Sequence, residues 1–203
     1  MTSPVAERRT PRLLLRGFVD DDRSAFATIN ADPVVMEHYP APLTRQQSDA
    51  LVDRALATWG ERGYGLWAVE RRDAAAFIGY VGLWPVPDNG PVRARRDPFA
   101  EVGWRLRAAD WGNGFATEAA AQALHLARAL GLAEVVSFTA ATNVRSQAVM
   151  RRLGMTHDPR DDFDHPALPP GHILRRHVLH RWVPHPGSSA ATPPQPRTPG
   201  PPA

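Results

Sequence analysis

Two glycines separated by one residue, Gly112 and Gly114, lie between a strand-like segment and a helix-like run. Glycine adopts backbone conformations closed to other residues and lets a ligand approach the main chain closely. The helix expected from Phe115 onward begins with amide N–H groups that lack intrahelical partners and carry the positive end of the helix dipole. Together these features predict a pyrophosphate site over Gly112 to Thr117.

The segments on either side of this turn differ in periodicity. Val102, Trp104 and Leu106 alternate with charged residues and a glycine, which predicts a strand. Apolar residues then recur at helical spacing, at Phe115, Ala119, Ala123, Leu126, Ala127 and Leu130. Gly131 follows at the position of a left-handed helix stop. We therefore expect a strand, a glycine turn and a long helix at the centre of the fold.

Three kinds of phosphate site compete for this turn. A P-loop requires a lysine after its last glycine, but the chain contains no lysine. A dinucleotide fingerprint requires a third glycine, where Thr117 stands, and an apolar strand, where Glu101 and Arg105 stand. A nucleotide-binding oxidoreductase is therefore only an alternative.

The third kind of site fits the residues better. Trp111 to Ala116 resembles the acyl-CoA pyrophosphate loop of the GNAT acetyltransferase superfamily, in the variant typical of its ribosomal-protein N-acetyltransferase branch. Trp111 departs from the broad superfamily, in which Gln or Arg is commoner. A second signature follows in the family's order: Asn143-x-x-Ser146, then Arg152-Leu-Gly-Met155. The opening segment Thr10 to Arg16 also resembles the branch, so the resemblance covers about residues 12–182.

The resemblance implies an α/β (α+β) GNAT fold. Its mixed, mostly antiparallel central sheet is flanked by helices and splayed between its fourth and fifth strands. Acetyl-CoA is the implied cosubstrate, with its pantetheine arm in that gap. The implied contacts are Trp104, Arg105 and Leu106 for pantetheine, and Gly112, Asn113, Gly114, Phe115, Ala116 and Thr117 for pyrophosphate. Asn143 is expected either to bind pantetheine or its surrounding loop, or to cap a helix.

Two side chains are candidates for the chemistry. An extended strand from Glu101 to Leu106 covers about 16 Å, comparable to a pantetheine arm. Glu101 would then lie near the thioester and accept a proton from the attacking amine, directly or through water; the alternative is a structural carboxylate. Ser146, or a water it holds, is the candidate that protonates the departing thiolate, with a helix cap as its alternative.

The rest of the chain reads as the elements of the same fold. We expect strands over 12–16, 66–71, 77–84, 134–141 and 173–182, and helices over 20–31, 44–60 and 143–153. Thr44 and Gln47 match a capping box. Residues 1–11 are expected to be disordered, residues 12–183 to form one domain, and the Pro-rich residues 184–203 to form a disordered tail.

Composition limits the function classes. The chain has 203 residues, no cysteine and a formal net charge of +3, with 24 basic against 21 acidic residues. Disulfides, thiolate metal sites and a cysteine nucleophile are excluded. We expect a cytoplasmic monomer or homodimer with no metal, no nucleic-acid partner and no membrane partner, because no basic stacking platform, signal segment or apolar span is present.

The sequence predicts an N-acetyltransferase that moves acetyl from acetyl-CoA to a primary amine by direct attack in a ternary complex. The acceptor is a protein N-terminus or a small-molecule amine, and a catalytically silent acyl-CoA-binding module is the alternative. Asp161, Asp162 and Asp164 lie in a polar loop that we expect beside the acceptor side. Clustered carboxylates there would favour a cationic acceptor; the alternative is a solvated loop.

Overall fold

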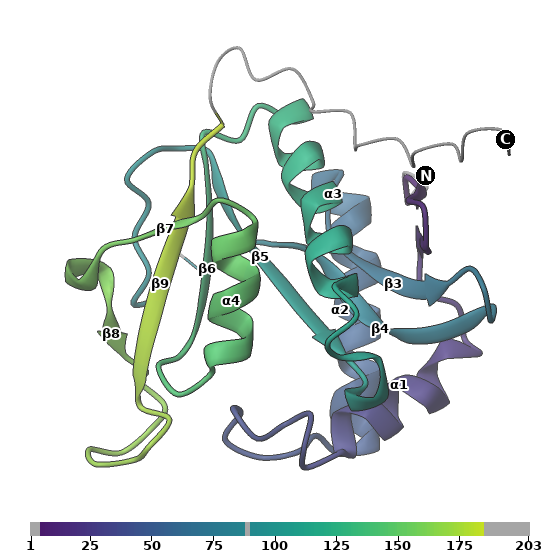
Figure 1. Cartoon of the computed structure of the whole chain (residues 1–203), viewed down its shortest axis with the longest axis horizontal. Coiled ribbons are helices and arrows are strands. Elements are labelled where there is room, and N and C mark those ends of the chain that lie inside the picture. The colour runs from purple at the N-terminus through teal and green to yellow at the C-terminus, as the bar shows by residue number, and fades with distance from the viewer. Residues whose placement is uncertain (1–4, 88–89, 185–203) are drawn as a thin grey trace, which may run out of the picture.

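The computed structural model describes residues 5–87 and 90–184, which form one mixed sheet of nine strands flanked by helices (Figure 1). The sheet order is β1-β2-β3-β4-β5-β6-β9-β7, with β8 paired to β9. The strands are β1 (Arg8–Arg9), β2 (Leu13–Arg16), β3 (Leu66–Arg71), β4 (Ala76–Trp84), β5 (Phe99–Leu106), β6 (Glu134–Ala140), β7 (Thr156–His157), β8 (Phe163–Asp164) and β9 (Arg176–Trp182). The expected mixed, mostly antiparallel sheet is confirmed.

The two central strands pair over only part of their length. β5 and β6 are the parallel pair of the sheet, and their registered residues end at Glu101 opposite Val136. Beyond that point β5 continues to Leu106 and β6 to Ala140 without pairing with each other, although β5 stays paired with β4 and β6 with β9. The expected splay is therefore confirmed, and it leaves backbone N–H and C=O groups of β5 unpaired on the side facing β6.

Four α-helices cover the two faces of the sheet. They are α1 (Asp22–Ala31), α2 (Arg45–Arg62), α3 (Phe115–Ala129) and α4 (Val144–Arg152). Figure 1 shows α3 and α4 in front of the sheet, with α1 and α2 behind it. α3 packs through a row of alanines, of which Ala119, Ala123 and Ala127 are fully buried. Small side chains allow close approach to the strands, whereas Leu130, expected on this face, lies past the helix end and is 43% exposed.

The helix ends follow the local signals. Thr44 and Gln47 form both hydrogen bonds of the expected capping box. α2 runs through Gly60 and stops at Gly63, which has the left-handed φ of +70° that ends a helix. Gly131 plays the same part after α3 with a φ of +72°.

The expected disorder of residues 1–11 is wrong for residues 5–11. Arg8 and Arg9 pair with β2, and the Trp67 indole donates a hydrogen bond of 2.9 Å to the Ala6 carbonyl. Two arginines carry no strand pattern by themselves, so only the neighbouring strand and the indole reveal this element. It also shifts the strand numbering by one, so the splayed pair is β5 and β6. Residues 1–4 and 185–203, which include almost all of the expected tail, lie outside the described residues.

Candidate active site

The glycine turn has the backbone geometry that its sequence predicts. Gly112 and Gly114 have φ values of +79° and +78°, in the left-handed region. A short 3₁₀ turn at Ala108–Asp110 leads into them, and the Asn113 amide donates a hydrogen bond of 3.2 Å to the Asp110 carbonyl. These contacts turn the chain from the end of β5 directly into α3, so the start of the helix borders the cavity described below.

The start of α3 has the free donors that an anion requires. Its N-cap is Gly114, which has no side chain to accept from the first helical amides. The hydroxyl of Thr117, in the first turn, is buried and has no hydrogen-bond partner among the described residues. A buried hydroxyl without a partner is costly unless a ligand satisfies it. The residues present therefore fit a pyrophosphate group held between the glycines and the helix.

The N-terminal segment clamps this turn from outside. Arg12 bonds the Glu118 carboxylate from its Nε at 2.7 Å and the Asn113 carbonyl from its Nη1 at 2.8 Å. Thr10 donates a further hydrogen bond of 2.6 Å to Glu118, and the Arg12 guanidinium lies 4.7 Å from the centre of the Phe115 ring. Arg12 is not among the predicted site residues, although the segment Thr10 to Arg16 resembles the family.

A cavity of about 1000 Å³ opens beside this turn. All residues predicted to bind acetyl-CoA line it: Trp104, Arg105, Leu106, Gly112, Asn113, Gly114, Phe115, Ala116, Thr117 and Asn143. Ser146 lines it as well, whereas Glu101 does not. The structure thus brings together three segments that are distant in sequence, namely the end of β5, the start of α3 and the start of α4.

Asn143 acts as the N-cap of α4. Its side-chain oxygen accepts from the Ser146 amide at 3.0 Å, and its amide donates to the Thr139 hydroxyl at 3.0 Å and the Ser146 hydroxyl at 3.3 Å. The cap alternative is therefore confirmed for Asn143. Because Ser146 accepts in this bond, its hydroxyl proton remains available to donate into the cavity.

Glu101 lies where the splay begins, registered with Trp84 on one side and Val136 on the other. It is half-buried, and burial raises the pKa of its carboxyl to about 7. No hydrogen bond or ion pair reaches the carboxylate from any described residue. This does not support the alternative of a structural carboxylate in a hydrogen-bond network.

Gly103 keeps the space next to Glu101 open. Residues 101, 103 and 105 share one face of β5, and a Cβ placed on Gly103 would meet only one described atom within 4 Å, the Glu101 Oε1 at 3.8 Å. The carboxylate therefore leans over Gly103, toward the cavity end of the strand. Gly103 is not among the predicted site residues, because a lone glycine in a strand carries no specific signal.

The Arg105 side chain occupies the other end of that face. It donates to the Asn30 oxygen at 2.6 Å and lies 4.2 Å from the centre of the Tyr39 ring. The buried guanidinium is thus directed toward α1 and the loop after it. The pantetheine contact predicted for Arg105 therefore involves its main chain only.

A bridge of three side chains, which sequence reasoning did not find, crosses the cavity rim. Arg145, in the first turn of α4, forms an ion pair with Glu37 from the loop between α1 and α2. Its guanidinium also lies 4.9 Å from the centre of the Trp111 ring, beside the glycine turn. The bridge connects the loop after α1 to both walls of the cavity.

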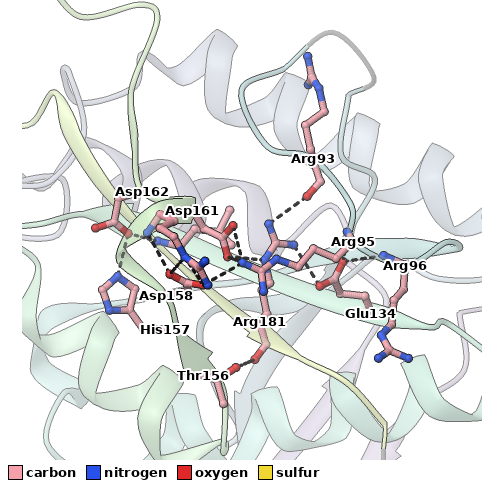
Figure 2. A network of polar contacts seen from close by, with 12 residues as sticks. Arg93, Arg95, Arg96, Glu134, Thr156, His157, Asp158, Asp161, Asp162 and Arg181 are labelled. Atoms are coloured by element: carbon pink, nitrogen blue, oxygen red, sulfur yellow. Dashed lines mark hydrogen bonds and ion pairs between the residues drawn. The ribbon is translucent and has the colours of Figure 1, made fainter.

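The aspartate loop lacks the free carboxylates that its expected role in acceptor selection requires. Figure 2 shows Asp161 held between Arg95 and Arg181, at 2.9 and 2.8 Å. Asp162 lies 2.8 Å from the His157 ring, and Asp164 pairs with Arg175 at 3.1 Å. These carboxylates are neutralised by arginines from β9 and from the loops, and none of them lines the cavity. Their ion pairs therefore hold the loop to the sheet.

The network in Figure 2 extends into the core. Glu134, which is 1% exposed, accepts from Arg181 at 3.0 Å and from the Arg95 amide at 2.8 Å. Within residues 5–87 and 90–184, no group of three or more His, Asp or Glu side chains is arranged to hold a metal ion. In the same residues, no helix has the length and apolar character needed to cross a membrane.

Comparison with known proteins places the chain in a family. The acetyltransferase (GNAT) domain family matches residues 12–156. The FsC-acetyl coenzyme A-N(2)-transacetylase of Aspergillus fumigatus is 31% identical over 171 residues, which cover 80% of this chain and 70% of the relative. These matches leave the oxidoreductase alternative without support.

Solved structures share the fold. The acetyltransferase from Agrobacterium tumefaciens str. C58 superposes with a TM-score of 0.71 at 25% identity, over 91% of this chain and 98% of that chain. A ribosomal L7/L12 alpha-N-protein acetyltransferase, solved in complex with coenzyme A, superposes with a TM-score of 0.66 at 16% identity, over 89% and 96% of the two chains. With the family match and the cavity at the glycine turn, this chain belongs to the GNAT acetyltransferases, which take their acetyl group from acetyl-CoA.

Proposed function

We propose that this enzyme transfers acetyl from acetyl-CoA to a primary amine by direct attack in a ternary complex. The acceptor is a protein N-terminus or a small-molecule amine. One observation carries the proposal: an unpaired, half-buried carboxyl with a pKa of about 7, Glu101, lies where β5 and β6 separate. A general base works best when its pKa lies near the working pH.

The donor is held by main chain more than by side chains. The amides from Gly112 to Thr117 bind the pyrophosphate, and the hydroxyl of Thr117 adds a donor. The backbone of β5 from Trp104 to Leu106, unpaired toward β6, forms hydrogen bonds with the pantetheine amides. This arrangement carries the thioester from the glycine turn toward the start of the splay.

The acceptor reaches the thioester from the face of the sheet that carries Glu101 and Gly103. The ammonium form of the acceptor loses one proton to Glu101, directly or through one water, and its nitrogen then attacks the thioester carbonyl carbon. The new C–N bond forms and the C–S bond breaks. The departing thiolate takes a proton from the Ser146 hydroxyl or from a water held there. The nitrogen, made acidic by the new C–N bond, loses its second proton and thereby restores the proton that Ser146 or the water gave up. Glu101 releases its proton to solvent, and the products are an amide and free CoA.

A screen of amines and N-terminal peptides tests this function, with release of the CoA thiol as the readout. We expect release with at least one acceptor class, and loss of about 10²-fold in rate for Glu101→Gln with that acceptor. If acetyl-CoA binds but no amine or peptide produces thiol release, the chain is a silent acyl-CoA-binding module instead.

A further inference from the structure

Four arginine side chains line the cavity, namely Arg12, Arg105, Arg145 and Arg152. Arg12 forms an ion pair with Glu118, and Arg145 forms one with Glu37. The Arg105 guanidinium is enclosed by Tyr39 and hydrogen-bonded to α1. Arg152 differs from all three, because no described residue forms a hydrogen bond, ion pair or ring contact with its side chain. It is an exposed and uncompensated cation at the wall of an anion-binding cavity.

Its position on α4 determines what it faces. Ser146, Val149 and Arg152 are spaced by three residues, share one helix face, and all line the cavity. Arg152 lies about 9 Å along the helix axis from Ser146, at 1.5 Å per residue, and so lies well away from the residue proposed to act at the thiol.

The neighbouring Arg151 provides a natural comparison. It is also exposed and also lies in the last turn of α4, but it does not line the cavity. Its charge acts instead on His180 of β9. Both arginines have the same favourable interaction with the negative end of the helix dipole. The dipole therefore does not explain why one of them faces the cavity without a carboxylate partner.

Acetyl-CoA brings two separate anionic groups into this cavity. The glycine turn and the start of α3 account for the pyrophosphate. The second group is the phosphate monoester on the 3′ oxygen of the ribose, which carries a charge of about −1.5 to −2 at neutral pH, as other phosphate monoesters do. A guanidinium binds such a group through two parallel N–H···O bonds. Of the four cavity arginines, Arg152 alone is free to do so without first breaking an existing contact.

We propose that Arg152 binds the 3′-phosphate of the CoA nucleotide and makes this enzyme select CoA over 3′-dephospho-CoA. The inference rests on acetyl-CoA as the donor, but not on the identity of the acceptor or on the role of Glu101. It assigns a specificity-determining residue to the cavity wall formed by the last turn of α4.

Calorimetric titration of the full chain with CoA and with 3′-dephospho-CoA tests it without any acceptor. We expect the wild-type protein to bind CoA about tenfold more tightly, which is the lower range for a charge-assisted hydrogen-bonded pair at an exposed site. Arg152→Met should bind the two ligands equally and retain the wild-type affinity for 3′-dephospho-CoA. The matched control Arg151→Met removes the same charge from the same helix turn and should keep the tenfold preference.

Each other outcome overturns the inference in a distinct way. Equal binding of the two ligands by the wild-type protein shows that the 3′-phosphate is not recognised, and leaves the acetyltransferase function intact. An equal loss of preference in Arg151→Met and Arg152→Met assigns the effect to general surface charge. Failure of the wild-type protein to bind either ligand contradicts the acetyl-CoA site as a whole.

Discussion

Replacing Glu101 with Gln has an effect on stability that changes with pH. The folded protein raises the pKa of this carboxyl from 4.5 to about 7 through burial. Below pH 4.5 the group is protonated in both the folded and the unfolded chain, so its ionisation does not lower the free energy of unfolding. Between pH 4.5 and about 7 the unfolded chain binds fewer protons than the folded one, so stability falls across this window. Above pH 7 the ionised carboxylate lowers the free energy of unfolding by about 3 kcal/mol.

The neutral amide of Glu101→Gln has no such dependence. We therefore expect the stability of the variant, relative to the wild-type protein, to increase as the pH rises from 4 to 8, by up to about 3 kcal/mol. For a chain of this length, that difference corresponds to roughly 6–12 °C in melting temperature. Thermal unfolding of both proteins at several pH values measures it, and the change of the difference with pH removes any constant effect of the substitution itself.

Activity should move in the opposite direction. The wild-type rate should rise with pH and level off above about 7, the pKa that burial gives Glu101. In Glu101→Gln, this rise of the rate with pH should disappear. The variant should react about 10²-fold more slowly at pH 8, with little change in the KM for acetyl-CoA. Suppose instead that the variant is less stable at every pH and retains the wild-type rate profile. Glu101 would then be a structural carboxylate with an ordinary pKa, and the reasoning from burial would be refuted.

Two further variants test the cofactor site and the loop network. Acetyl-CoA should raise the melting temperature of the wild-type protein but not of Gly114→Val, because a φ of +78° strains valine and distorts the turn. Gly131→Val is the control, since its φ of +72° brings the same strain at a position that does not line the cavity. Arg181→Met leaves the buried Glu134 carboxylate without its cation, so urea unfolding should show a loss of about 3–5 kcal/mol. The KM for the acceptor should stay unchanged in this variant, and a rise of several-fold would restore the loop to acceptor selection.

Much of the site could be predicted from the sequence because it is local. The left-handed backbone at Gly112 and Gly114, the start of α3 behind them and the cap formed by Asn143 all depend on residues a few positions apart. Steric limits on the backbone and the unsatisfied groups at helix ends act over the same short range. For this reason, the residues that the motifs predict to contact acetyl-CoA all line the cavity.

The aspartate loop shows the opposite case. Its composition predicted an acidic surface, but the partners that neutralise it come from distant segments: Arg95 contacts Asp161 from 66 positions away, and Arg181 contacts it from 20. Net charge in a window of sequence says nothing about such pairing. A charged loop becomes an electrostatic site only where its carboxylates lack partners, and folding decides that.

The sequence by itself determined the glycine turn, the helix ends, the order of the elements and the family, because each depends on short-range backbone chemistry or on a motif of neighbouring residues. Only the tertiary structure decided the pKa of Glu101, the free guanidinium of Arg152 and the clamp of Arg12 on Glu118. Burial and charge pairing arise from segments brought together across the sheet, and a carboxyl or guanidinium has the same formula in the sequence whether its neighbours in space are water, hydrocarbon or an opposite charge.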